Sequence, residues 1–141
     1  MVYLKNSNIK VLGTEDVAKV FQDILALEDQ IEQEKEHYYV MHLDSKNKVK
    51  MVELVTVRTL NSSLVHPRET FRRAVITGSA TIIIAHNHPS GETGPSIEDT
   101  KVTKLMFEAG QILGTDFSVV LFRPHFMPAS EEHLMKMHKN Q

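Results

Sequence analysis

The sequence contains no cysteine among its 141 residues. It therefore has no disulfide bond and no thiolate ligand, so any metal site must use histidine and carboxylate side chains. It also has no run of about 18 apolar residues, the length that a membrane-spanning helix needs. Its first residues do not form the apolar core of a secretion signal. These absences predict a cytoplasmic protein that does not enter a membrane.

The sequence also lacks an excess of positive charge. Sixteen Lys and Arg stand against eighteen Asp and Glu, which gives a formal net charge of −2. Nucleic-acid-binding domains usually carry a basic patch. Two small basic groups, Arg68 to Arg73 and Lys136 with Lys139, are best explained as solvated helix faces. Nucleic acid therefore remains open as a partner, without support from the charge.

The length and the order of the expected elements indicate one α/β domain over residues 1–141. Residues 1–13 are expected to be a mostly irregular lead-in with one edge strand at 9–12, and 123–141 a divergent tail. Hydrophobic spacing predicts helices over 15–35, 67–77 and 97–113, and strands over 37–43, 49–57, 80–85 and 116–122. This order predicts a mixed sheet between helices.

Several residues have expected places in these elements. Thr14 is expected to cap the first helix, and Ser130 to cap a short last helix through Met137. Helical spacing predicts buried side chains at Leu27 and Ile31 in the first helix, at Phe71, Ala74 and Val75 in the second, and at Val102, Leu105, Met106, Ala109, Ile112 and Leu113 in the third.

The stretch from His86 to Asp99 carries the chemistry. His86 and His88 follow a β-branched strand, and alternate residues of an extended chain point to the same side. Ser96 and Asp99 lie about one helical turn apart where the next helix begins. Two imidazoles and one carboxylate make a three-ligand site suited to zinc, with a fourth position open for water.

The same residues also allow a structural interpretation. Ser96 is a good helix cap, and an acid at Asp99 suits the positive end of the helix dipole. A His-x-His pair alone is a weak indication of a metal site. The joint pattern of two histidines, a serine and an aspartate between a strand and a helix is much more specific.

That joint pattern resembles the JAMM (MPN-plus) metalloprotease signature, and its exact residues resemble those of the RadC family. The resemblance covers about residues 14 to 120 and rests on His86-Asn87-His88-Pro89-Ser90-Gly91, Pro95-Ser96, Asp99, the block from Thr59 to Glu69, and the block from Leu43 to Asn47. It implies a three-layer fold similar to cytidine deaminases. It also implies that zinc is bound by His86, His88 and Asp99. The helix-hairpin-helix region of full-length family members is not expected within this chain.

The resemblance also implies two catalytic roles. A glutamate at the start of the strand after the first long helix would be the general base, and Glu36 has that place. Ser96 would donate a hydrogen bond to the oxyanion. Glu53 and Glu69 compete with Glu36 for the role of base, because sequence alone does not fix the side to which Glu53 points.

Neighbouring polar residues have ordinary explanations. His37 and His42 are expected on opposite faces of their strand as surface or packing residues, and His66 as a loop histidine. Asn87 is expected to hold the loop through bonds from its side chain to the backbone. Asp116-Phe117 and the tail from Arg123 depart from the family pattern.

The expected function is that of a zinc-dependent hydrolase acting on a peptide or isopeptide substrate of unknown identity. One alternative is a DNA-associated repair protein or metal-dependent nuclease. The other is a non-catalytic binding module. The sequence gives neither the scissile bond nor the oligomeric state.

Overall fold

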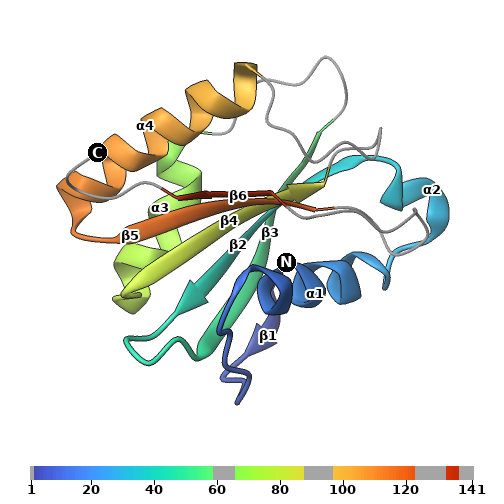
Figure 1. Cartoon of the computed structure of the whole chain (residues 1–141), viewed down its shortest axis with the longest axis horizontal. Coiled ribbons are helices and arrows are strands. Elements are labelled where there is room, and N and C mark those ends of the chain that lie inside the picture. Colours follow the sequence, from blue (N-terminus) through green and yellow to red (C-terminus); the bar gives the residue numbers. More distant parts are fainter. Residues whose placement is uncertain (1, 59–65, 88–96, 123–132, 137–141) are drawn as a thin grey trace.

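The computed structural model describes residues 2–58, 66–87, 97–122 and 133–136. Within these ranges the side chains of 58, 97–100, 102, 121–122 and 133–136 are not described. The elements, drawn in Figure 1, are β1 (Val2–Lys5), α1 (Thr14–Leu25), α2 (Gln30–Gln33), β2 (Glu36–Leu43), β3 (Val49–Arg58), α3 (Pro67–Thr77), β4 (Thr81–Asn87), α4 (Ile97–Leu113), β5 (Asp116–Phe122) and β6 (His133–Lys136).

The described strands form one six-stranded sheet in the order β1-β3-β2-β4-β5-β6. β4 and β5 are parallel, and the other neighbouring pairs are antiparallel. Helices α1 and α2 cover one face of the sheet, and α3 and α4 cover the other (Figure 1). This confirms the expected fold class, an α/β protein with a mixed sheet between two helical layers.

The core is divided by the sheet into two hydrophobic clusters. Alternate residues of a strand point to opposite faces. Tyr39 and Ile83 therefore pack with α1, whereas Tyr38, Ile82 and Ile84 pack on the face of α3 and α4. β4 is buried on both faces, as its uncharged β-branched sequence predicts.

The hairpin that joins β2 and β3 is fixed by its turn. The carboxylate of Asp44 accepts hydrogen bonds from the backbone N–H groups of Lys46 (2.8 Å) and Lys48 (3.0 Å). These bonds lower the pKa of Asp44 below its ordinary value because they stabilise the ionised carboxylate. Asn47 adopts the left-handed conformation with φ 61°, which asparagine tolerates well. The predicted hairpin is confirmed.

The first predicted helix is interrupted, contrary to the expectation of one helix over 15–35. α1 ends at Leu25, and α2 begins after Asp29, whose side chain accepts a hydrogen bond from Glu32 N–H at 2.8 Å. This cap favours a new helix start over continuation. Leu27 and Ile31, which lie beyond the end of α1, are consequently exposed.

The cap of α1 is Gly13, whose side chain cannot bond, and Thr14 is already helical. The expected cap at Thr14 was therefore wrong by one position.

Helix α4 has the predicted bounds, but of the described residues that were expected to be buried only Met106 is fully so. Thr103, Met106 and Gly110 are buried, whereas Leu105, Ile112 and Leu113 are exposed. The reason is Gly110: a Cβ placed there would lie 2.7 Å from the backbone oxygen of Thr115. The helix therefore turns its glycine, and not its larger apolar residues, towards the chain that leads into β5.

Helix α3 follows its expected face more closely. Phe71 and Ala74 are buried as expected, but Val75 is exposed. Pro67 is in its first turn, and the left-handed Gly78 (φ 64°) ends it.

Both ends of the chain differ from expectation because strand pairing overrides weak local patterns. Val2–Lys5 forms β1 against β3, within the lead-in that was expected to be irregular. Of the strand expected at 9–12, only a bridge from Lys10 to Lys48 forms. His133–Lys136 is strand β6, where a helix was expected, because it pairs with backbone groups of β5. Ser130 lies outside the described residues.

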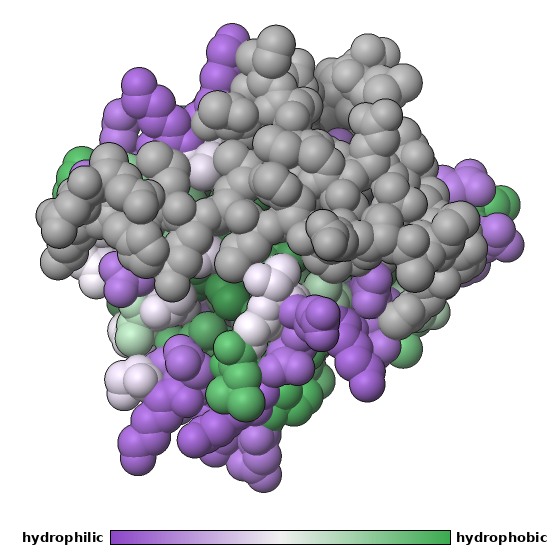
Figure 2. All heavy atoms as spheres, in the orientation of Figure 1, coloured by the Kyte–Doolittle hydropathy of each residue, from purple (hydrophilic) through white to green (hydrophobic). Residues whose placement is uncertain are grey.

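Among the described helices, none is long and apolar enough to cross a membrane. The exposed large hydrophobic residues are distributed over different elements, for example Leu12, Leu27, Ile76 and Ile112. On the face in Figure 2, hydrophilic side chains separate the hydrophobic groups among the described residues.

Candidate functional site

The candidate site lies at one end of the sheet, where β2 begins and β4 ends. These strands are antiparallel neighbours, with Tyr38 opposite His86. Glu36 is the first residue of β2, and His86 is the second-last residue of β4. Helix α4, whose first turn contains Asp99, begins at the end of the sheet where β4 ends (Figure 1). The start of β2, the end of β4 and the start of α4 thus lie at the same end of the sheet.

Glu36 and His86 lie side by side. Oε1 of Glu36 is 3.4 Å from Nδ1 of His86. The imidazole is almost fully buried, whereas the Glu36 side chain is about one quarter exposed, with a relative accessibility of 25%. The separation is slightly longer than a well-formed N–H···O bond. The ring of Tyr38 stacks on His86 with centroids 5.9 Å apart.

The remaining expected residues of the site are not described. His88 and Ser96 lie outside the described residues, and only the backbone of Asp99 is described. Among the side chains that the structure does describe, no group of three His, Asp or Glu could hold a metal ion. Of the five residues predicted for the site, the structure therefore brings Glu36 and His86 together.

His86 is the one proposed zinc ligand whose side chain is described, and its surroundings suit that role. A histidine that binds zinc usually has a polar group such as a carboxylate close to its ring. His86 is buried at a strand end and has the Glu36 carboxylate beside Nδ1. Imidazole is also one of the nitrogen donors that zinc prefers.

The competing carboxylates are placed elsewhere. Glu53 lies on β3, which β2 separates from β4. Its Oε2 is 2.7 Å from Nε of Arg73, and its Oε1 is 3.0 Å from Nε2 of His42. Glu69 is exposed in the first turn of α3. Both oxygens of Glu53 are therefore engaged, in a cluster apart from His86.

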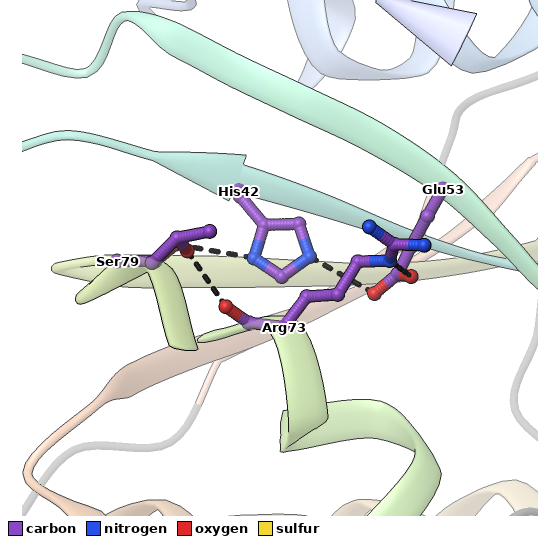
Figure 3. Close-up of polar contacts among 5 residues, drawn as sticks. His42, Glu53, Arg73 and Ser79 are labelled. Atoms are coloured by element: carbon purple, nitrogen blue, oxygen red, sulfur yellow. Dashed lines mark hydrogen bonds and ion pairs between the residues drawn. The ribbon is translucent and has the colours of Figure 1, made fainter. Parts of the chain in front are cut away.

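That cluster is a polar network which the sequence did not reveal. Figure 3 shows His42 between Ser79 and Glu53, with Arg73 reaching Glu53 from α3. Nδ1 of His42 is 3.2 Å from the hydroxyl of Ser79. His42, Ser79 and Glu53 are all buried. His42 was expected at the surface or in packing, and Arg73 on a solvated face. No short motif marks the network, because its members come from different elements.

Asn87 also differs from expectation. It does bond to the backbone through its side chain, but the partners described are in the segment 33–37 and not in the loop that follows. Asn87 is fully buried, with 0% exposure. His37 is likewise buried, with Nδ1 2.8 Å from the carbonyl oxygen of Lys35. His66 is the exposed residue that precedes α3.

Comparison with known proteins agrees with this geometry. The family model described as "RadC-like JAB domain" matches residues 11–121. A UPF0758 protein of Chlorobium phaeovibrioides is 41% identical over 114 residues, which cover 81% of this chain and 49% of the relative. One from Caldanaerobacter subterraneus subsp. tengcongensis is 42% identical over 114 residues, 81% of this chain and 47% of the relative.

A UPF0758 protein of Methanosarcina acetivorans is 47% identical over 85 residues, 60% of this chain and 37% of the relative. The chain thus spans about half the length, or less, of these curated relatives. The family model covers most of the chain and includes both Glu36 and His86. The chain belongs to the RadC-like JAB domain family.

Proposed function

We propose that this chain is a zinc-dependent hydrolase that cleaves an amide or isopeptide bond of a peptide substrate. The observation that carries the proposal is the contact between Glu36 and His86, 3.4 Å apart at the end of a buried strand. A carboxylate open to solvent beside a buried imidazole suits proton transfer next to a metal ligand. Membership of the RadC-like JAB domain family supports the same chemistry.

Each residue has a definite role in this proposal. His86, His88 and Asp99 hold the zinc. When bound, zinc would lower the pKa of a bound water to about 7 and polarise the scissile carbonyl. Glu36 accepts the proton of the attacking water and returns it to the leaving amine. Ser96 donates a hydrogen bond to the oxyanion.

Glu36 is preferred to the other carboxylates for a physical reason. A general base must lie within hydrogen-bond reach of the proton that it removes, and Glu36 is the carboxylate that lies beside His86. One oxygen of Glu53 contacts Nε of Arg73, and the other contacts Nε2 of His42. Glu69 is exposed on α3 and has no described contact with His86.

The proposal is tested first by metal content. The wild-type protein is expected to bind about one zinc per chain, the stoichiometry of a single three-ligand site. His88→Ala is expected to lose that zinc because it removes one ligand. The measurement is elemental analysis of both purified proteins after zinc is supplied and excess metal is removed. Absence of zinc from the wild-type protein would contradict the proposal.

Hydrolysis is then measured on fluorogenic peptides and on peptides joined through a lysine ε-amide. Glu36→Gln is expected to keep its zinc and to lose roughly 100-fold or more in kcat, because the amide cannot accept the proton. Glu69→Gln is the matched control, a similar change at an exposed position, and is expected to keep both zinc and activity. Full activity in Glu36→Gln would remove Glu36 from the mechanism.

A further inference from the structure

The side chain of Asn87 holds both peptide groups that meet at the Cα of Glu36. Its Oδ1 accepts the backbone N–H of His37 at 2.7 Å. Its Nδ2 donates to the carbonyl of Lys35 at 2.9 Å and to that of Gln33 at 3.3 Å. The Lys35 carbonyl belongs to the peptide group before Glu36, and the His37 N–H to the one after it. The two bonds together restrict φ and ψ of Glu36.

These bonds require an amide. A neutral planar group must offer one acceptor towards His37 and two donors towards the carbonyls of Lys35 and Gln33, which can only accept. An aspartate at position 87 would keep the acceptor but place a second oxygen against the two carbonyls. Because Asn87 is fully buried, water does not replace a lost bond, and each unsatisfied group is costly.

The same strand end also positions His86. The described pairing of β2 with β4 ends at Tyr38 and His86, and the next residue of β4, Asn87, binds the next amide of β2, at His37, through its side chain. His86 and Asn87 point to opposite faces of the sheet. One strand end therefore carries the imidazole and fixes the segment that bears the Glu36 carboxylate.

The geometry points to Asn87 as a positioning residue that holds Glu36 in its place beside His86 and acts on hydrolysis through Glu36. This inference rests on the proposed function, in which Glu36 is the base. A displacement of about 1 Å in a reacting group can cost about 100-fold in rate. A flexible chain at residues 33–37 would allow such displacements.

The test compares Asn87→Asp with the wild-type protein. Hydrogen–deuterium exchange of the peptide that covers residues 33–38 is expected to become faster in the variant, because the carbonyls of Lys35 and Gln33 lose the Asn87 donor and face a carboxylate oxygen instead. On the lysine ε-amide peptide, kcat is expected to fall by roughly 10- to 100-fold. KM and zinc content are expected to stay within about twofold, since the substrate and metal contacts are unchanged.

A double variant separates positioning from a merely structural role. If Asn87 acts through Glu36, Asn87→Asp has no further effect on the residual kcat of Glu36→Gln, measured in single turnovers. An equal loss in both backgrounds would overturn the inference, and so would an unchanged kcat or unchanged exchange at 33–38. Ser79→Ala is the matched control, a buried polar residue in the His42 cluster. It is expected to lower stability and to keep kcat.

Two further measurements keep the inference testable if Asn87→Asp does not fold. Asn87→Ser introduces no charge and is expected to show the same changes in exchange and kcat. In the wild-type protein, the side-chain NH₂ of Asn87 is expected to exchange slowly by NMR and to lie near the carbonyl of Lys35. Rapid exchange of this NH₂ would overturn the inference. A wild-type protein that binds zinc but hydrolyses neither peptide would contradict the proposed function alone. The exchange measurements would still show whether the Asn87 side chain holds residues 33–37 in place.

Discussion

Charged and polar residues in this protein depend on partners that come from other secondary-structure elements. Glu53 illustrates this best, because Arg73 and His42 engage its two oxygens. A carboxylate that is largely removed from water must be paired, or its charge is costly. The pairing of Glu53 thus explains both why the residue is charged within a strand and why it is a poor candidate for the catalytic base.

The residue-scale prediction concerns Glu53→Gln. The change removes the negative charge opposite Arg73 and replaces one of the two acceptor oxygens by an NH₂ group. Because the Arg73 side chain is about half exposed, with a relative accessibility of 45%, part of the loss is recovered by water. We expect a decrease of about 2 kcal/mol in the free energy of unfolding, measured by urea denaturation.

Glu69→Gln serves as the control, with an expected change within about 0.5 kcal/mol for an exposed position. Folded Glu53→Gln is also expected to keep its kcat. A loss of kcat as large as that of Glu36→Gln, with zinc retained, would reassign the base to Glu53.

Secondary-structure elements in this protein are oriented by close backbone contacts as well as by hydrophobic residues. In α4, Gly110 faces the chain that enters β5, and the larger apolar residues Ile112 and Leu113 face outward. The helix can approach β5 this closely only because the glycine has no Cβ. Gly110 therefore determines which face of α4 is buried, and that face packs on Phe71 and Phe117.

The element-scale prediction is that Gly110→Ala destabilises the protein. In an unconstrained helix this change would stabilise by about 1 kcal/mol. Here the added Cβ would meet the Thr115 oxygen at 2.7 Å and the rings of Phe71 and Phe117 at 3.5 Å. We expect a net loss of about 1–3 kcal/mol in the free energy of unfolding. The matched control is Glu108→Ala at an exposed position of α4. A Gly110→Ala protein more stable than wild type would show that the contact is not tight.

The net charge of the whole molecule is not that of a typical nucleic-acid-binding domain. Its formal net charge is −2. Of the three arginines on α3, Arg73 is already neutralised by Glu53, so only Arg68 and Arg72 remain for other anions. Non-specific binding to DNA depends on many such cations acting together. The overall charge therefore gives no support to the alternative of a nucleic-acid partner.

The whole-molecule prediction is that this chain binds duplex DNA weakly. We expect fluorescence anisotropy with a labelled 20-base-pair duplex to give a Kd above roughly 100 µM near 150 mM salt, at or beyond the weak end of non-specific binding. The same duplex is titrated at low salt. Tight binding at low salt, with a steep dependence on salt concentration, would contradict this prediction and support the DNA-associated alternative.

The sequence by itself determined the elements that depend on interactions between residues close together in the chain. The apolar run before His86 predicted β4, the polar turn at Asp44 predicted the hairpin, and Pro67 with Gly78 predicted the limits of α3. These predictions succeeded because periodicity, turn chemistry and helix caps act over a few residues. The motif also predicted a site between a buried strand and a helix, and the structure places His86 at that junction.

Only the tertiary structure decided which distant groups meet. Asn87 and His37 are 50 positions apart in the sequence, and the His42–Glu53–Arg73 network joins two strands and a helix. The buried face of α4 likewise follows from the approach of β5 to Gly110 and not from its apolar pattern. Such contacts have no local signature, because they depend on strand order and register, which the chain fixes only when the whole sheet assembles.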